Sequence, residues 1–114
     1  MWYSLLALNL HHPDEILAQV EIGADSPWFR GHFPDAPILP GVAQLHMVAE
    51  VITHASDKKL SLQRLSRVKF KRPVGPGAVL TIRIHSTADD RYTFQIRHED
   101  QDVCSGTMSF AIQR

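Results

Sequence analysis

The side chains best placed to do chemistry lie on a predicted helix over residues 42–55. Its polar members His46, Glu50, Thr53 and His54 are spaced by four, three and one residues, so they form one narrow stripe. Such a stripe on a buried helix faces a cavity, a partner subunit or water. The histidine and the carboxylate are a candidate proton-transfer pair. They could equally be an i, i+4 pair with a structural role, in which the two side chains partner each other at the margin of the core.

The start of this helix is a second place where a reaction could be assisted. Pro40 and Gly41 lead into a first turn whose N–H groups have no intrahelical acceptor. These groups and the helix dipole favour partial negative charge. A carbonyl oxygen that gains charge during a reaction could therefore accept a hydrogen bond from the Gly41 N–H. If Gly41 is the N-cap, Gln44 is expected to fold back on the first turn in a structural role.

The helix is apolar almost all round, which predicts that other elements surround it. A helix on the outside of a sheet shows one apolar stripe and one polar face. This helix instead carries apolar residues on several faces: Val42, Ala43, Leu45, Met47, Val48, Ala49, Val51 and Ile52. We therefore expect it to be wrapped by a sheet or sandwiched between partners.

The remaining segments predict an α+β domain. Strands are expected at residues 2–9, 18–22, 64–72, 79–86, 92–98 and 103–112, mostly as antiparallel hairpins. Residues 26–41 (SPWFRGHFPDAPILPG) hold four of the seven prolines, so they are predicted to form a long irregular loop of a kind that is often functional. At 114 residues, a single domain spanning residues 1–114 is expected.

Composition excludes several classes of function. The 12 basic and 12 acidic side chains cancel, which argues against a protein that blankets nucleic-acid phosphates. The single cysteine, Cys104, rules out an intramolecular disulfide and a multi-cysteine zinc site, and a reducing cytoplasmic setting is expected. Cys104 is predicted to be a small core residue. His11 and His12 are adjacent at a strand end, and two such histidines rarely bind the same metal ion, so no metal site is predicted. The apolar stretch at residues 2–10 is too short to span a membrane.

Residues 31–42 (GHFPDAPILPGV) resemble the signature of the hotdog-fold 3-hydroxyacyl-[acyl-carrier-protein] dehydratases. The pattern is GHFP, two residues, Pro, two residues, and then PG opening the central helix. The downstream run RLSRVKFKRPVGPGAVLTIRI also resembles the strand, turn and strand of that family, and the likeness covers roughly residues 29–112. The short chain and the helix start GVAQLH are most similar to the dehydratases of aryl-polyene lipid pathways.

This resemblance implies a fold, a partner and a mechanism. The fold would be a hotdog, a long central helix wrapped by a curved antiparallel sheet, in a homodimer or higher homo-oligomer whose sheets pair edge to edge. The active site would lie at the subunit boundary. The loop histidine, here His32, would remove the α-proton of a 3-hydroxyacyl thioester, and Gly41 would donate its N–H to the thioester carbonyl. The substrate would arrive on the phosphopantetheine arm of acyl-carrier protein, with no metal or nucleotide cofactor.

The sequence departs from the fatty-acid dehydratases on the acid side of the site. They carry Asp or Glu five residues after the helix-start glycine, where this chain has His46. A carboxylate appears one turn later, at Glu50, where the family often has Gln. One explanation is that His46, held by Glu50, acts as the general acid, because a nearby carboxylate favours the protonated imidazole. The other is that the site has lost or changed its chemistry.

Other residues complete the expected site. Phe29, Phe33, Pro40 and Val42 are expected to contact the substrate, with Trp28 and Phe29 packing the loop or lining the mouth of an acyl tunnel.

Four basic residues are candidates for contact with the carrier. Arg67, Lys69 and Lys71 alternate on one predicted strand face and are joined by Arg72; they are either a docking patch for the acidic carrier or a solvated face.

The predicted function is dehydration of a carrier-bound 3-hydroxyacyl chain to the trans-2-enoyl thioester, in fatty-acid or polyene-type lipid synthesis. One rival is an acyl thioesterase on the same fold, with Glu50 or a held water aimed at the thioester carbon. Another is a non-catalytic acyl-carrier-binding partner of an active dehydratase.

Overall fold

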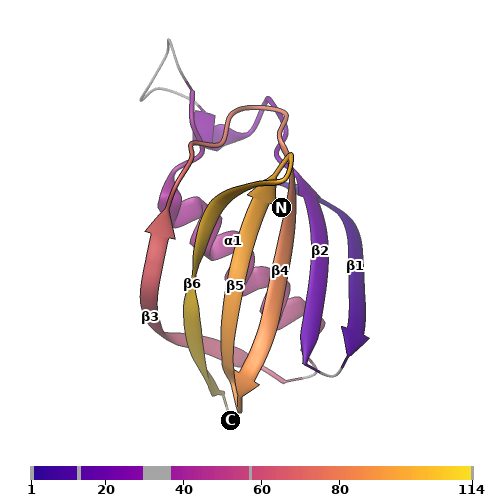
Figure 1. The fold of residues 1–114 in the computed structure, drawn as a ribbon, viewed down its shortest axis with the longest axis vertical. Helices are drawn as coiled ribbons and strands as arrows, with labels where there is room; N and C mark the ends of the chain where they lie inside the picture. The colour runs from indigo at the N-terminus through magenta and orange to yellow at the C-terminus, as the bar shows by residue number, and fades with distance from the viewer. Residues whose placement is uncertain (1, 13, 30–36, 57, 114) are drawn as a thin grey trace.

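The computed structural model describes residues 2–12, 14–29, 37–56 and 58–113. Six strands form one antiparallel sheet in the order β1-β2-β4-β5-β6-β3, and a single long helix, α1, lies against one of its faces (Figure 1). The elements are β1 (Ser4–His12), β2 (Glu15–Glu21), the short 3-10 helix η1 (Pro27–Phe29), α1 (Gly41–Ala55), β3 (Leu60–Phe70), β4 (Val79–Ala88), β5 (Arg91–His98) and β6 (Gln101–Ile112). The predicted α+β class is confirmed.

Helix α1 ends at Ala55 as predicted and begins at Gly41, with Pro40 as its N-cap. The Pro40 carbonyl accepts the backbone N–H groups of Ala43 at 3.1 Å and Gln44 at 3.2 Å, which closes the first turn. Proline suits the residue before a helix because its fixed φ matches this entry and its missing N–H loses nothing there. Gly41 is therefore the first residue of the helix and not its cap.

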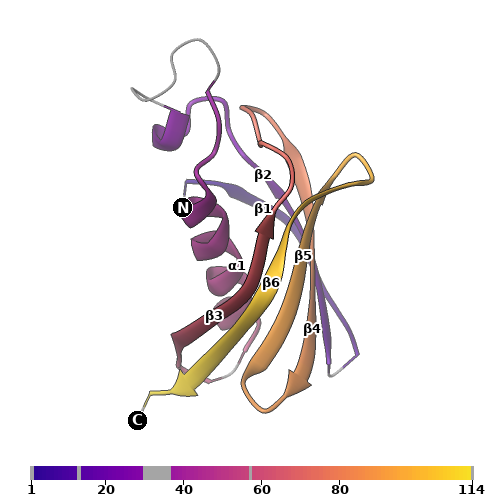
Figure 2. The same ribbon diagram turned by 60° about the vertical axis from the view of Figure 1, so that its left-hand side comes forward.

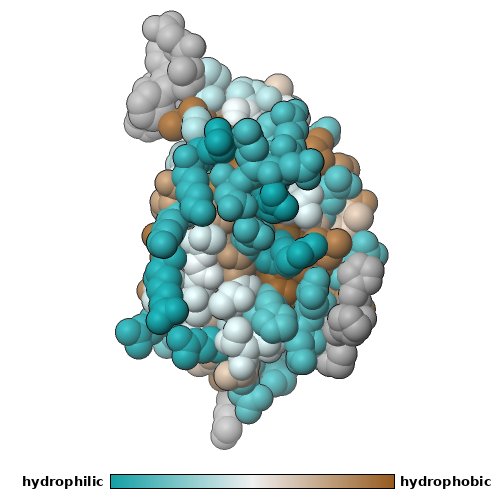
Figure 3. All heavy atoms as spheres, in the orientation of Figure 1, coloured by the Kyte–Doolittle hydropathy of each residue, from teal (hydrophilic) through white to brown (hydrophobic). Residues whose placement is uncertain are grey.

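The twisted sheet covers one face of α1 (Figure 2). The buried residues of the helix are Ala43, Gln44, Met47, Val48, Val51 and Ile52. They belong to the same core as the inward side chains of the central strands, among them Val20, Leu80, Ile82, Ile84 and Ile96. The opposite face of the sheet is largely polar (Figure 3), as expected for strands whose side chains alternate between core and solvent.

Part of the apolar helix surface is left uncovered within one chain. Val42 is 67% exposed, and Leu45 and Ala49 are only partly buried. The expectation that the helix is surrounded is therefore met on one face only.

Strand β3 is less regular than predicted. It runs from Leu60 and ends at Phe70, and its pairing with β6 takes in one extra residue between Ser66 and Lys69. Arg67 lies in this bulge with a φ of 54°. Because the bulge interrupts the alternation and Lys71 follows the strand, the prediction that Arg67, Lys69 and Lys71 share one strand face is wrong.

The sheet has two edges, formed by β1 and β3. Each edge exposes apolar side chains: Leu6 and Leu10 on β1, and Leu62, Leu65 and Phe70 on β3. Within the described ranges, none of the helical segments has the length and apolar character that a membrane crossing requires.

Candidate functional site

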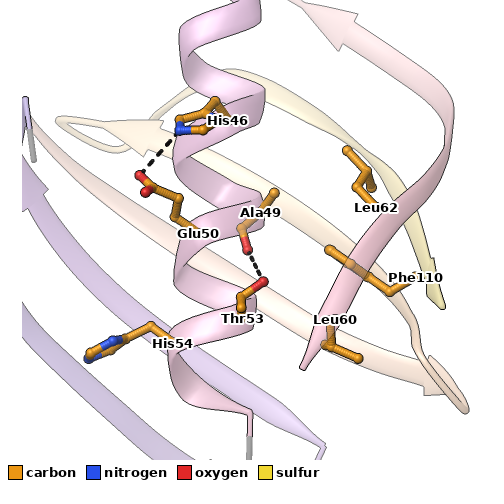
Figure 4. Close-up of a pocket in the computed structure, with 8 residues that line it drawn as sticks. All are labelled: His46, Ala49, Glu50, Thr53, His54, Leu60, Leu62 and Phe110. Carbon is orange, nitrogen blue, oxygen red and sulfur yellow. Dashed lines mark hydrogen bonds and ion pairs between the residues drawn. The ribbon is translucent and has the colours of Figure 1, made fainter. Parts of the chain in front are cut away.

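The polar stripe of α1 lines a cavity of about 410 Å³. His46, Glu50, Thr53 and His54 form the helical wall of this cavity together with Ala49. The opposite wall is apolar and comes from Leu60 and Leu62 on β3 and Phe110 on β6 (Figure 4). Of the three surroundings that the stripe could have, the structure shows a cavity. The apolar wall was not predicted, because nothing local in the sequence connects β3 or β6 to the stripe.

His46 and Glu50 form an ion pair at the rim of this cavity. His46 Nε2 lies 3.6 Å from Glu50 Oε1, and the two side chains are 59% and 40% exposed. An exposed i, i+4 pair stabilises a helix by only about 0.3–0.5 kcal/mol. Fold stability is therefore a weak reason for this pair, whereas its place on a cavity lets both groups reach a ligand.

Tyr3 contacts the same carboxylate from the start of the chain. Its hydroxyl donates a hydrogen bond of 3.1 Å to Glu50 Oε1. Burial, and then the charge and hydrogen bond of Glu50, raise the pKa of Tyr3 well above its ordinary value, so the hydroxyl keeps its proton and remains a donor. Sequence reasoning missed this contact because the two residues are 47 positions apart.

A second cavity, of about 420 Å³, lies at the start of α1. It is lined by Gly41 and Gln44 from the helix, Ile38 and Leu39 before it, and Phe70, Lys71, Arg72 and Pro73 from the end of β3 onward. The structure thus places Gly41 in one cavity with two of the predicted carrier-binding residues. Gln44 is buried and its Nε2 donates to the Leu39 carbonyl at 3.4 Å, which confirms a structural role for this side chain.

Gly41 is in close contact with the ring of Phe70. A Cβ atom at position 41 would lie 2.7 Å from Phe70 Cζ, far inside van der Waals contact. The sequence points to Gly41 because its N–H group lies in the first turn of the helix. The structure adds a packing reason for it, since only a residue without a side chain leaves room for this ring.

The other predicted site residues have different surroundings. Phe29 and Pro40 are partly buried, and Val42 is exposed. His32 and Phe33 lie outside the described residues, so their predicted roles stay predictions.

The four basic residues Arg67, Lys69, Lys71 and Arg72 are all exposed. Lys71 Nζ forms an ion pair of 3.5 Å with Asp102 Oδ2.

Cys104 is a core residue, as predicted. It is buried on β6, and burial raises the pKa of its thiol to about 11. At neutral pH the sulfur is therefore held as the unreactive thiol, which is unsuited to nucleophilic catalysis.

Comparison with known proteins finds similar dehydratases. The model of the ApeI-like family, described as ApeI dehydratase, matches residues 9–107. The 3-hydroxyacyl-[acyl-carrier-protein] dehydratase FabZ of Chlamydia trachomatis is 33% identical over 110 residues, which span 85% of this chain and 72% of that protein.

Two solved structures are also similar. The dehydratase heterocomplex ApeI:P from Xenorhabdus doucetiae contains a chain that superposes with a TM-score of 0.87 at 28% identity, over 97% of this chain and 99% of that one. A hypothetical thioesterase from Streptococcus pneumoniae shares the fold alone, with a TM-score of 0.70 at 11% identity over 97% and 90% of the two chains. The family match spans most of the chain and includes α1 with His46 and Glu50, so this protein belongs to the ApeI-like dehydratase family.

Proposed function

We propose that the chain dehydrates a 3-hydroxyacyl thioester carried by acyl-carrier protein to the trans-2-enoyl thioester. The observation that carries the proposal is the His46–Glu50 pair on the wall of a cavity, in a chain of a dehydratase family. Dehydration needs an acid beside the leaving hydroxyl and a base at the neighbouring carbon. A half-exposed imidazole paired to a carboxylate supplies a suitable acid.

Each group has one task in the proposed reaction. His32 removes a proton from C2, and the electron pair of that C–H bond forms the C2=C3 double bond. The imidazolium of His46 gives its proton to the C3 hydroxyl, which leaves as water, while Glu50 holds the imidazole. The Gly41 N–H stabilises the charge that develops on the thioester oxygen. Gly41 and His46 line different cavities of one chain, so in this proposal the two groups that serve one substrate come from two copies of the chain. Protons and electrons balance within this scheme, so its chemistry requires no oxidant or reductant.

The surroundings of the helix start support the proposed carrier. Acyl-carrier proteins are acidic, and the exposed Lys69, Lys71 and Arg72 lie on or just after the end of β3. Lys71 and Arg72 line the same cavity as Gly41. A carrier docked on these cations would deliver its phosphopantetheine arm to the first turn of α1, with Phe29, Phe33, Pro40 and Val42 as substrate contacts.

We also place a second copy of the chain on β3. An edge strand offers unpaired N–H and C=O groups, and β3 adds exposed apolar side chains at Leu62 and Leu65. Leu62 also lines the His46–Glu50 cavity, so a partner on this edge would border the site. This arrangement accounts for the apolar helix surface that one chain leaves uncovered.

The decisive experiment is incubation of the purified chain with a 3-hydroxyacyl carrier, followed by mass spectrometry of the carrier. Loss of one water with the thioester retained supports the proposal. Release of the free acid would instead identify a thioesterase. Substitution of His32 by alanine should abolish the loss of water while the fold and the oligomer persist.

A mixed complex is the second candidate. It is favoured by the fact that the similar solved chain comes from a dehydratase heterocomplex. In that case the chain would show no dehydration alone but would be active, or activate its partner, when a second dehydratase chain is added. The same mass measurement, made with and without the second chain, separates the two candidates.

A further inference from the structure

Three side chains meet at one carboxylate oxygen. Tyr3 donates to Glu50 Oε1 at 3.1 Å, and His46 Nε2 lies 3.6 Å from the same atom. The tyrosine is only 6% exposed, whereas both members of the ion pair are open to the cavity. The buried end of this chain of contacts is therefore Tyr3, and the exposed end is the candidate acid.

The tyrosine is itself held in place by aromatic packing. The Trp2 ring meets the Tyr3 ring edge-on, with centroids 4.9 Å apart and an interplanar angle of 74°. Trp2 also packs edge-on against Trp28 at 5.9 Å, and Trp28 belongs to η1, just before the segment that contains His32. Such pairs restrict ring movement beyond simple burial. The phenol oxygen is thus presented to α1 by a fixed group.

This geometry matters because an exposed carboxylate has several rotamers. Its ion pair with His46 is weak at this exposure, and a hydrogen bond from a neutral donor to a charged acceptor is the stronger contact. Tyr3 therefore decides where the carboxylate lies, and the carboxylate in turn decides how the imidazole is oriented. Nothing in the geometry brings Tyr3 itself to the open part of the cavity, since the residues that line it do not include Tyr3.

We infer that Tyr3 is a positioning residue, which holds the Glu50 carboxylate against His46 and so orients the imidazole for proton transfer to the leaving hydroxyl. This inference rests on the proposed function. It also gives the first residues of the chain a task in the chemistry of a helix 47 positions away.

The test is a double-mutant cycle made of Tyr3→Phe, Glu50→Ala and the double variant, with kcat and KM measured on a 3-hydroxyacyl carrier. Tyr3→Phe removes only the hydroxyl, and we expect it to lower kcat about 10-fold, as for the loss of a hydrogen bond to a charged group. KM should change by less than about 2-fold. In the Glu50→Ala background the same change should have almost no effect, because Tyr3 acts through Glu50.

Tyr92→Phe is the matched control, because Tyr92 is the only other tyrosine of the chain and it lines a different cavity. It should leave kcat unchanged. A wild-type kcat in Tyr3→Phe would overturn the inference. So would a loss of kcat in the double variant equal to the sum of the two single losses in free energy, because the Tyr3–Glu50 hydrogen bond would then have only a structural role.

The same cycle measured on chemical unfolding separates this inference from the proposed function. Coupling between Tyr3 and Glu50 in unfolding, without coupling in kcat, leaves dehydration standing and rejects the positioning role. A wild-type protein that makes no enoyl product, alone or with a second dehydratase chain, rejects the proposed function. The positioning role then falls with it, even if the unfolding data confirm the contact.

Discussion

The proposed acid is an imidazole, that of His46, and its chemistry differs from that of a carboxyl group. An imidazolium donates a proton with a neutral group left behind, whereas a carboxylic acid leaves a charge. The loss of a water needs only one proton at the C3 oxygen, so either donor suffices. In the proposed reaction Glu50 is the group that holds the imidazole, with the Tyr3 hydroxyl donating a hydrogen bond to it from behind.

The prediction at this scale concerns His46. Replacing it with glutamine keeps a polar side chain of similar reach but removes the acid, and general acid catalysis is worth about 100-fold or more in rate. We expect kcat in the carrier assay to fall by that factor. His85→Gln is the control, because His85 is exposed on β4 and is not among the residues that line this cavity. Equal losses in the two variants would remove His46 from its proposed role.

The start of α1 and the end of β3 meet at Gly41 and Phe70, so this contact depends on how the two elements pack together. The half-exposed Phe70 ring fills the space that a side chain at position 41 would need, and both residues line the cavity at the helix start. A side chain at position 41 must push the ring, and the ring can move because about half of its surface is free. A side chain at position 41 should therefore change the shape of the cavity more than the stability of the fold.

Gly41→Ala tests this arrangement. We expect the free energy of unfolding to fall by about 1 kcal/mol, the low end of the range for overpacking. We also expect KM to rise by a factor that corresponds to more free energy than this loss, because the displaced ring narrows the cavity. Adding Phe70→Leu to Gly41→Ala should bring KM part of the way back to the wild-type value. Gly75→Ala is the control, since a Cβ there meets no atom within 4 Å. An unchanged KM in Gly41→Ala would show that the ring does not border the substrate path.

Across the whole molecule, the numbers of acidic and basic side chains are equal, but the basic side chains are not spread evenly over the surface. The exposed cations Lys71 and Arg72 line the cavity at the helix start, and the exposed Lys69, on β3, lies two residues before Lys71, although the formal net charge is zero. Lys71 is partly neutralised by Asp102, so Lys69 and Arg72 are the better positions for a test.

A double change of Lys69 and Arg72 to glutamate should raise KM for the carrier-bound substrate about 10-fold, with an effect that weakens as salt increases. The KM for the same acyl group on a small free thiol should not change, because that substrate does not dock on the cations. Arg83→Glu, on the central strand β4, is the control. A rise for both substrates would mean that the residues act on the site itself rather than on the carrier.

The two sheet edges allow a test of the proposed dimer. Leu65→Asp on β3 should convert the dimer to a monomer in light-scattering measurements and lower dehydration, because a buried charge opposes edge pairing. Leu6→Asp on the other edge, β1, should leave the dimer intact. A monomeric wild-type protein, or a dimer that only the β1 change disrupts, would contradict the proposed arrangement.

Helix α1 and its stripe could be predicted because helical geometry is local. The spacing of His46 and Glu50 alone puts them on one face, whatever the rest of the chain does. Strand β3 is predicted at residues 64–72 but runs from Leu60 to Phe70 with a bulge at Arg67, since both its ends and its bulge depend on how the strand pairs with β6. The contact of Tyr3 with Glu50 had no local signal at all.

By itself the sequence determined the α+β class, the helix with its polar stripe and the motif at the helix start, since each of these depends on neighbouring residues, whereas most of the predicted loop over residues 26–41 lies outside the described residues. Only the tertiary structure decided which distant groups meet: Phe110 and Leu62 opposite the stripe, Phe70 on Gly41, and Tyr3 on Glu50. The physical reason is that these contacts are set by strand register and by burial against a shared core, which are properties of the assembled chain and not of any one segment.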